Sequence, residues 1–161
     1  MLKQILSPGT CADCRMCCVF DCYDVWNTPV ILPELRNKIQ KILPDAEFLS
    51  AGTESYRFRM HPECDSFACP LLNPEKGCLL GDEKPFDCRI FPFRLMHLDD
   101  STVIAVSPLC DALTQYSLKT LLNFVKAELA EKLFTYAEQH PDVIHVYDPL
   151  YPVLLWKPMK F

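Results

Sequence analysis

Four thiols fall within eight residues in the stretch Cys11-Ala-Asp-Cys14-Arg-Met-Cys17-Cys18. A thiolate is a soft, anionic ligand, and gaps of two residues let successive sulfurs approach one metal centre. This spacing predicts a fold arranged around a metal, with chemistry that starts at the metal and not at a side-chain acid or base. Six further cysteines are spread along the chain: Cys22, Cys64, Cys69, Cys78, Cys88 and Cys110.

The composition favours a single domain of ordinary size. The chain has 161 residues and half of them are apolar, so a hydrophobic core can form without disulfide staples. The apolar segment at residues 1–6 is too short for a secretory signal, and no run has the length of a membrane span. We therefore expect a reducing cytoplasm, where clustered cysteines are metal ligands or redox groups more often than cystines.

The charge and the glycine content restrict the class of partner. The formal net charge of −5 argues against a nucleic-acid backbone as the main partner. Only four glycines occur, and neither the P-loop nor the dinucleotide-binding pattern is present in the sequence. We expect a metal ion or cluster as the ligand, with no nucleic acid and no membrane partner, and leave a protein partner open.

Hydrophobic periodicity predicts several helices and strands. Apolar residues at helical spacing and flanking prolines predict a helix over residues 33–43. Alternation predicts a strand over 56–60, and two apolar stretches at 94–98 and 102–107 predict a hairpin with a polar three-residue turn. Ser117 is expected to cap a long helix over 118–139. Short strands are expected at 143–147 and 153–156.

Together these features predict a small, irregular α+β fold that is helix-rich and organised by metal. We expect one domain over residues 1–161, with a cysteine-rich metal-binding lobe at 11–112 and a helical extension and tail at 113–161. The apolar stripe of the long helix is expected to pack against the metal-binding lobe. Its residues are Leu118, Leu121, Leu122, Val125, Leu129 and Leu133.

The adjacent pair Cys17-Cys18 limits what the first stretch can bind. In a helix or in an extended strand, neighbouring side chains point in different directions. One of the two thiols is therefore expected to serve a second site or a different atom of a cluster. The spacing Cys11-x2-Cys14-x2-Cys17 also matches the first three ligands of a ferredoxin-type cluster loop.

The later cysteines lie among groups that suit a buried metal site. Gly77 before Cys78 permits a tight turn, and Phe86 near Cys88 can exclude water. Four thiolates around Zn²⁺ or a [4Fe–4S]²⁺ core leave a net charge near −2. Arg15 and Arg89 are predicted to contact the cofactor site from outside the ligand shell and to lower the cost of burying this charge.

The order of these motifs resembles the CxxCxxCC family, the zinc- or iron-chelating domain of bacterial YkgJ-like proteins. The later parts of the pattern are Cys69-Pro-Leu-Leu, Gly77-Cys78, Pro85-x2-Cys88-Arg-x-Phe-Pro and Cys110-x-Ala112. A related cysteine motif occurs in flagellin lysine-N-methylase. The resemblance covers residues 11–112, and Lys84 stands where the family usually has arginine. It implies eight metal ligands: Cys11, Cys14, Cys17, Cys18, Cys69, Cys78, Cys88 and Cys110.

Three more residues near the motifs are less favoured as ligands. Cys22 and Cys64 look like additions to the family pattern, and burial as small hydrophobic groups or disulfide formation is favoured over metal ligation for them. His61 could supply a nitrogen ligand, but a single histidine beside a loop is more often solvated or hydrogen-bonded. No catalytic residue is assigned.

The leading hypothesis from the sequence is a cytoplasmic metal-chelating protein that binds an iron–sulfur cluster. A [4Fe–4S] cluster is the favoured type, and its expected role is redox chemistry or electron transfer. The alternative is a structural zinc site in a module that binds a protein partner. A methyltransferase-like enzyme is a third, lower-ranked hypothesis. The spacing leaves open iron or zinc, one metal site or two, and whether the protein is an enzyme.

Overall fold

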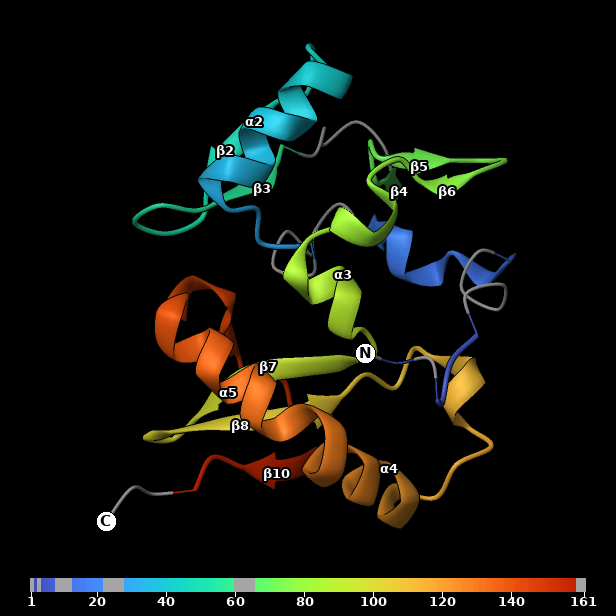
Figure 1. Ribbon diagram of the computed structural model, residues 1–161, viewed down its shortest axis with the longest axis vertical. Helices are drawn as coiled ribbons and strands as arrows, with labels where there is room; N and C mark the ends of the chain where they lie inside the picture. Colours follow the sequence, from blue (N-terminus) through green and yellow to red (C-terminus); the bar gives the residue numbers. More distant parts are fainter. Residues whose placement is uncertain (1, 3, 8–12, 22–27, 60–65, 159–161) are drawn as a thin grey trace. The chain divides into compact units, whose positions relative to one another are not determined.

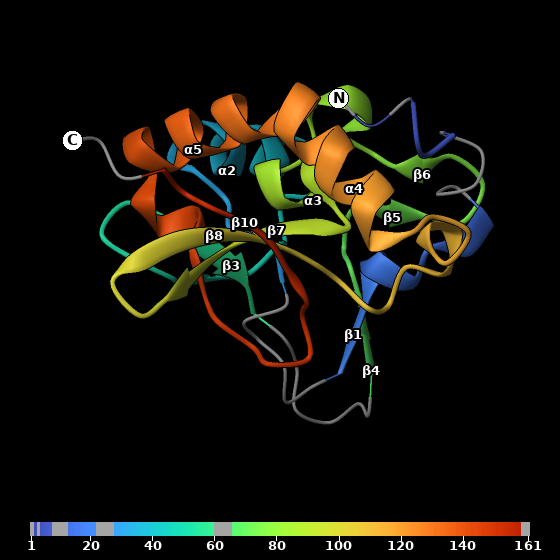
Figure 2. The same ribbon diagram turned by 90° about the horizontal axis from the view of Figure 1, so that it is seen from below.

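The computed structural model describes residues 2, 4–7, 13–21, 28–59 and 66–158. The chain forms two compact units. The first, here called the cysteine unit, spans Cys11–Arg89. The second, here called the sheet unit, comprises Met1–Thr10 and Ile90–Phe161. Figures 1 and 2 label most of the helices and strands of the two units.

The cysteine unit is made of short elements and two-stranded sheets. Strand β1 pairs antiparallel with β4, β2 with β3, and β5 with β6. The elements are η1 (Met16–Cys18), β1 (Val19–Asp21), α2 (Pro33–Ile42), β2 (Phe48–Ser50), β3 (Tyr56–Phe58), β4 (Ser66–Ala68), β5 (Leu72–Asn73), β6 (Gly77–Cys78), η3 (Gly81–Glu83) and α3 (Phe86–Ile90), whose last residue belongs to the sheet unit.

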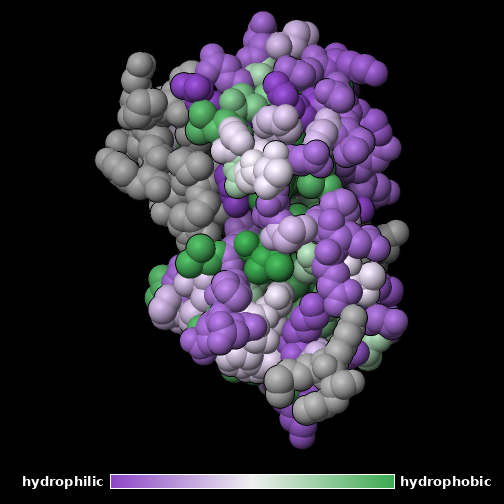
Figure 3. Space-filling view, turned by 90° about the vertical axis from the view of Figure 1, so that its left-hand side faces the viewer, coloured by the Kyte–Doolittle hydropathy of each residue, from purple (hydrophilic) through white to green (hydrophobic). Residues whose placement is uncertain are grey.

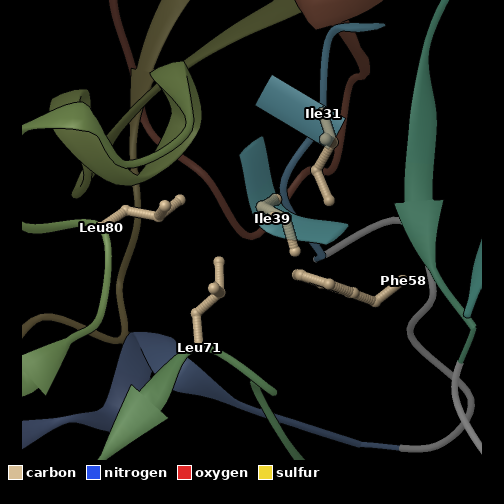
Figure 4. Packing of buried hydrophobic residues seen from close by; sticks show 5 residues of the cluster. All are labelled: Ile31, Ile39, Phe58, Leu71 and Leu80. Atoms are coloured by element: carbon tan, nitrogen blue, oxygen red, sulfur yellow. The ribbon is translucent and has the colours of Figure 1, made fainter. Parts of the chain in front are cut away.

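A hydrophobic cluster forms the core of the cysteine unit, and Figure 4 shows its five buried side chains converging from different segments. They are Ile31, Ile39, Phe58, Leu71 and Leu80. Cys69 and Cys78 are partly buried and pack against this cluster. The unit therefore has an apolar core of its own, and two of the predicted ligands are attached to that core.

Helix α2 confirms the prediction for residues 33–43. Pro33 occupies the first turn, where its missing N–H costs nothing, and Leu43 follows the last helical residue. Ile39 is fully buried on the side of the helix that faces the cluster, whereas Ile42 is 44% exposed. The apolar face of the helix is thus narrower than the sequence pattern indicates.

The sheet unit contains a four-stranded sheet in the order β10-β8-β7-β9. All neighbours are antiparallel except β7 and β9, which are parallel. Helices α4 and α5 lie against one face of the sheet (Figures 1 and 2). The elements are β7 (Phe93–Leu98), β8 (Ser101–Val106), η4 (Asp111–Leu113), α4 (Leu118–Phe124), the π-helical segment η5 (Val125–Leu129), α5 (Ala130–Gln139), η6 (Pro141–Val143), β9 (His145–Val146) and β10 (Val153–Trp156).

The predicted hairpin is confirmed as β7 and β8, but its turn is shorter than expected. Leu98 pairs with Ser101, so only Asp99 and Asp100 remain in the turn. Asp99 has a φ of 52°, in the left-handed region that tight hairpin turns require and that aspartate tolerates. Ser101 was predicted as a turn residue and instead begins the second strand.

The predicted long helix is a helical run from α4 through η5 to α5. Ser117 caps it as expected, because its Oγ accepts a hydrogen bond from the Thr120 amide at 3.1 Å. Its buried leucines and valine recur every four residues. In an α-helix of 3.6 residues per turn, side chains at this spacing shift around the helix axis by about 40° at each step. The π segment has more residues per turn, so it reduces this shift and keeps the buried side chains on one face. The buried set is Leu121, Val125, Leu129 and Leu133.

The helical run packs against the sheet of its own unit. Helix α4 and the π segment both contact β10, and Phe124 stacks on Phe93 of β7 with ring centroids 6.1 Å apart. The residues after 139 then return to this sheet, since β9 and β10 form its two edges. The segment predicted as a tail over the surface is therefore part of the sheet, and it buries Val143 and Tyr151.

The predicted fold class is wrong in two respects. About 37% of the described residues are helical, and several sheets accompany them, so the protein is a mixed α+β fold and not a helix-rich one. The prediction that metal organises the lobe also fails. Within the described ranges no group of three or more His, Cys, Asp or Glu side chains is arranged to hold a metal ion. The cysteine unit is instead built around an apolar core of its own, the hydrophobic cluster.

The face drawn in Figure 3 is mostly hydrophilic, with hydrophobic residues showing as separate small areas. Among the helices that the structure describes, none has the combined length and apolarity needed to cross a membrane.

Candidate metal centre

Strand pairing brings Cys18 and Cys69 together although they are about fifty residues apart in the sequence. Cys18 precedes β1 and Cys69 follows β4, and the two strands pair with Val19 opposite Ala68. The ladder continues into the cysteines, because the Cys69 amide donates to the Cys18 carbonyl at 2.8 Å. The backbone thus holds these two residues side by side.

A second pair of strands adds Cys78. The Leu72 amide donates to the Cys69 carbonyl at 2.9 Å, which closes a turn through Pro70. Leu72 then pairs with Cys78 across β5 and β6. Gly77 has a φ of 76°, a conformation that glycine adopts without strain, and it leads directly into Cys78.

Helix α3 carries Cys88 next to the buried Asp87. The Asp87 carboxylate accepts a hydrogen bond from the Val30 amide at 2.9 Å, which ties this helix to the segment before α2. Asp87 is therefore a structural acceptor, as expected for an aspartate outside a soft-metal shell. Cys88 itself is partly buried.

The sulfurs of these four cysteines act on one another electrostatically. Burial is the main cause that raises the pKa of Cys88 well above its ordinary value, and Asp87, Cys69, Cys18 and Cys78 raise it further. Burial likewise raises the pKa of Cys69 to about 12, and Cys18 and Cys78 again contribute. Four thiols from four separate segments therefore form one interacting group, here called the four-thiol set: Cys18, Cys69, Cys78 and Cys88.

Backbone amides favour a negative charge at Cys69. The amides of Leu71 and Leu72 hydrogen-bond to its sulfur and lower its pKa, against the larger effect of burial. These residues follow Cys69-Pro70, so the local turn brings two N–H groups near one sulfur, although the Leu72 N–H also donates to the Cys69 carbonyl. Amide hydrogen bonds to sulfur are a recognised feature of metal–thiolate sites, where they tune the metal.

Cys18 differs from the buried thiols because its charged form is favoured. A hydrogen bond from the Cys17 thiol is the main cause that lowers the pKa of Cys18 to about 7, and burial opposes it. Lys84 and Arg15 lower the pKa further through their positive charges. Cys18 thus ionises before the buried Cys69 and Cys88.

We expect alkylation of the metal-free, reduced protein by iodoacetamide to reflect this order, because the thiolate is the nucleophile. Reaction at Cys18 should be half-maximal near pH 7, whereas Cys69 should stay unreactive until close to pH 12. Mass spectrometry of peptides after short exposures measures both profiles. In Cys17→Ala the Cys18 midpoint should move toward the ordinary value of 9.0. A wild-type Cys18 midpoint already near 9.0 would show that the hydrogen bond is absent.

The other predicted ligands are not members of the four-thiol set. Cys14 is exposed, and Cys17 contacts the set through Cys18. Cys110 belongs to the sheet unit, where it precedes η4. Cys11, Cys22, His61 and Cys64 lie outside the described residues.

The two predicted arginines have different surroundings, and a lysine joins them. Arg15 acts on Cys18, in line with its expected role, and Arg89 lies over the Phe86 ring at 5.9 Å. Lys84 also acts on Cys18, although sequence reasoning assigned it no role. Its position immediately before Pro85, where the resembled family usually has arginine, was the signal for it.

The chemistry of the four-thiol set fits a soft metal, although the described side chains do not form a finished ligand cage. Cys69 and Cys88 must also lose their protons before they can bind a metal, since burial keeps both thiols neutral.

No family model, no curated protein and no solved structure matches this chain. The likeness to the CxxCxxCC family therefore rests on the residues of the motifs themselves.

Proposed function

We propose that this protein is a cytoplasmic metal-chelating protein of the CxxCxxCC type, and that it binds an iron–sulfur cluster through the four-thiol set. The observation that carries the proposal is the convergence of Cys18, Cys69 and Cys78 through backbone pairing, with Cys88 in electrostatic contact with all three. Thiolates are the ligands that iron–sulfur clusters use, and four of them complete a cubane site.

The surroundings of the set suit a cluster in particular. Cys69 and Cys78 pack against the hydrophobic cluster, which keeps water from one side of the site. The amides of Leu71 and Leu72 hydrogen-bond to sulfur, and Arg15 and Lys84 offset negative charge at Cys18. When bound, a cluster would supply one-electron redox chemistry. The protein's own residues hold it, exclude water from it and stabilise its charge.

The alternative is a structural zinc site that holds a surface for a protein partner. The observation in its favour is the number of donors, because four thiolates form a closed tetrahedral shell with no open position. Such a site needs no redox partner. No feature of the described residues favours the methyltransferase hypothesis.

Metal analysis of anaerobically purified protein tests the proposal. We expect about four iron and four acid-labile sulfide per chain, with broad visible absorption. A Cys18→Ser/Cys69→Ser double variant, purified in parallel, should contain neither. A colourless protein with about one zinc per chain would contradict the cluster and support the structural zinc site. A wild-type protein without iron or zinc would contradict both.

A further inference from the structure

Strand β10 is one edge of the four-stranded sheet, and among the described residues no strand pairs with its outer side. Figure 1 shows β10 at the lower border of the sheet, beyond β8. Its four residues are all apolar, and the last of them, Trp156, is 48% exposed. An edge strand of this kind presents backbone groups that can pair with another chain.

Hydrogen bonds at both ends of β10 identify the residues of β8 that bond to it. Before the strand, the Val106 amide donates to the Pro152 carbonyl at 3.0 Å. After the strand, the Lys157 amide donates to the Thr102 carbonyl at 2.9 Å. Bonded and unbonded residues alternate in an antiparallel ladder, so β8 bonds to β10 through Thr102, Ile104 and Val106.

Val153 and Trp156 are therefore the residues of β10 whose backbones face outward. They lie opposite Ala105 and Val103, which are the unbonded residues of β8 on this side. The N–H and C=O groups of an unbonded pair point away from the partner strand. No backbone hydrogen bond joins Val153 or Trp156 to another segment that the structure describes. Because Ala105 and Val103 are two positions apart, the side chains opposite them share one face of the sheet.

We propose that the outer edge of β10 pairs with the same edge of a second copy of this chain, antiparallel and around a two-fold axis. An axis between Leu154 and Leu155 places Val153 of each copy opposite Trp156 of the other. Each outward-facing residue then meets an outward-facing residue whose side chain lies on the same face. The contact is self-complementary, as a two-fold interface requires, and it joins the two four-stranded sheets into one.

The charges near the strand are compatible with this pairing. β10 itself has no charged residue, and the Lys157 ammonium after it is paired with Glu138 at 3.0 Å. Parallel pairing would set two copies of Lys157 side by side. Antiparallel pairing instead directs each Lys157 toward the end of the other strand that follows Asp148, so unlike charges approach.

The paired segment is short, because Pro152 and Pro158 stand on either side of it and cannot donate to a ladder. A small interface of this kind gives weak, reversible association, with a dissociation constant on the order of 10–100 µM. The pairing uses the sheet unit alone, so it does not depend on the proposed function.

Sedimentation velocity of the full chain over a concentration series tests the proposal, with a reductant present to exclude disulfide-linked dimers. We expect wild type to shift from monomer to dimer as its concentration rises. Trp156→Lys places a charge in the shared ladder and should raise the dissociation constant at least about 10-fold. Val146→Lys is the matched control, because it puts the same charge at an exposed residue of β9, the opposite edge strand. It should dimerise like wild type.

A mixture of two variants tests the register. Val153→Glu alone should also weaken self-pairing at least about 10-fold. In an equal mixture of Val153→Glu and Trp156→Lys, the mixed dimer places glutamate opposite lysine at one pair and keeps valine opposite tryptophan at the other. Dimer formation should therefore recover toward the wild-type level. Val153→Pro removes only an outward N–H and should weaken self-pairing even where glutamate disturbs the fold.

Three outcomes would overturn the inference. A wild type that stays monomeric at every concentration would show that a second copy does not occupy this edge. A dimer that Trp156→Lys leaves intact, or that Val146→Lys weakens equally, would overturn the assignment to β10. A mixture of folded Val153→Glu and Trp156→Lys that stays monomeric would overturn the two-fold register.

Discussion

Cys69→Ser should abolish metal binding while the metal-free protein stays folded. Cys69 lies between the two strand pairs that bring Cys18 and Cys78 near it, and its sulfur interacts with both of them. A serine hydroxyl is a weak ligand for a soft metal and ionises far less readily than a thiol. We expect affinity for the bound metal to fall on the order of 100-fold or more.

The measurement is metal content after anaerobic reconstitution, together with circular dichroism of the metal-free forms. Cys14→Ser is the matched control, because it removes an exposed thiol from the same family motif. It should retain the wild-type metal content. A full metal content in Cys69→Ser, or an equal loss of metal in Cys14→Ser, would contradict the assignment of the metal-binding site to the four-thiol set.

Local sequence signals predicted the elements that depend on neighbouring residues. The cap at Ser117, the start of α2 at Pro33 and the strand Val153–Trp156 all follow from rules that act within a few positions. The exception among local features is the turn at Asp99 and Asp100. Its length depends on which residues of the two strands pair, and alternation alone does not set that register.

The composition of the four-thiol set could not be predicted from spacing. The first stretch looked like half of an eight-ligand group, yet of its described thiols only Cys18 belongs to the set, with Cys17 attached to it. Cys18 joins Cys69 because β1 and β4 pair, and that pairing is a long-range property of the backbone. The family motifs include all four members of the set among eight candidate ligands, but they do not distinguish these four from the other four.

The helix-rich expectation failed because strands of two to four residues give little periodic signal. Both β5 and β6 contain two residues, too few for alternation to be visible in the sequence. The long helical run, in contrast, is conspicuous. A prediction from periodicity therefore overestimates the helical content and misses the short sheets that position Cys69 and Cys78.

Removing one buried side chain from the hydrophobic cluster should destabilise the metal-free cysteine unit far more than the same change at an exposed position of the same helix. Ile39 is fully buried in the cluster beside Phe58, and Ile42 lies on the same helix but is 44% exposed. Truncation of a buried isoleucine to alanine loses apolar burial and leaves a cavity, which costs about 2–5 kcal/mol. The same change at Ile42 should alter stability by less than about 1 kcal/mol.

Amide hydrogen exchange across α2 in metal-free, reduced protein provides the measurement, since it reports opening of this unit directly. Protection in Ile39→Ala should fall by roughly 30-fold or more, the equivalent of at least 2 kcal/mol. Ile42→Ala, a matched substitution of the same residue type, should remain close to wild type. The comparison also tests what holds the unit together. If metal-free wild type already lacks protection in α2, then the metal and not the apolar cluster maintains the fold. If protection persists and only Ile39→Ala loses it, the thiols of Cys69 and Cys78 are held in place by packing before any metal arrives.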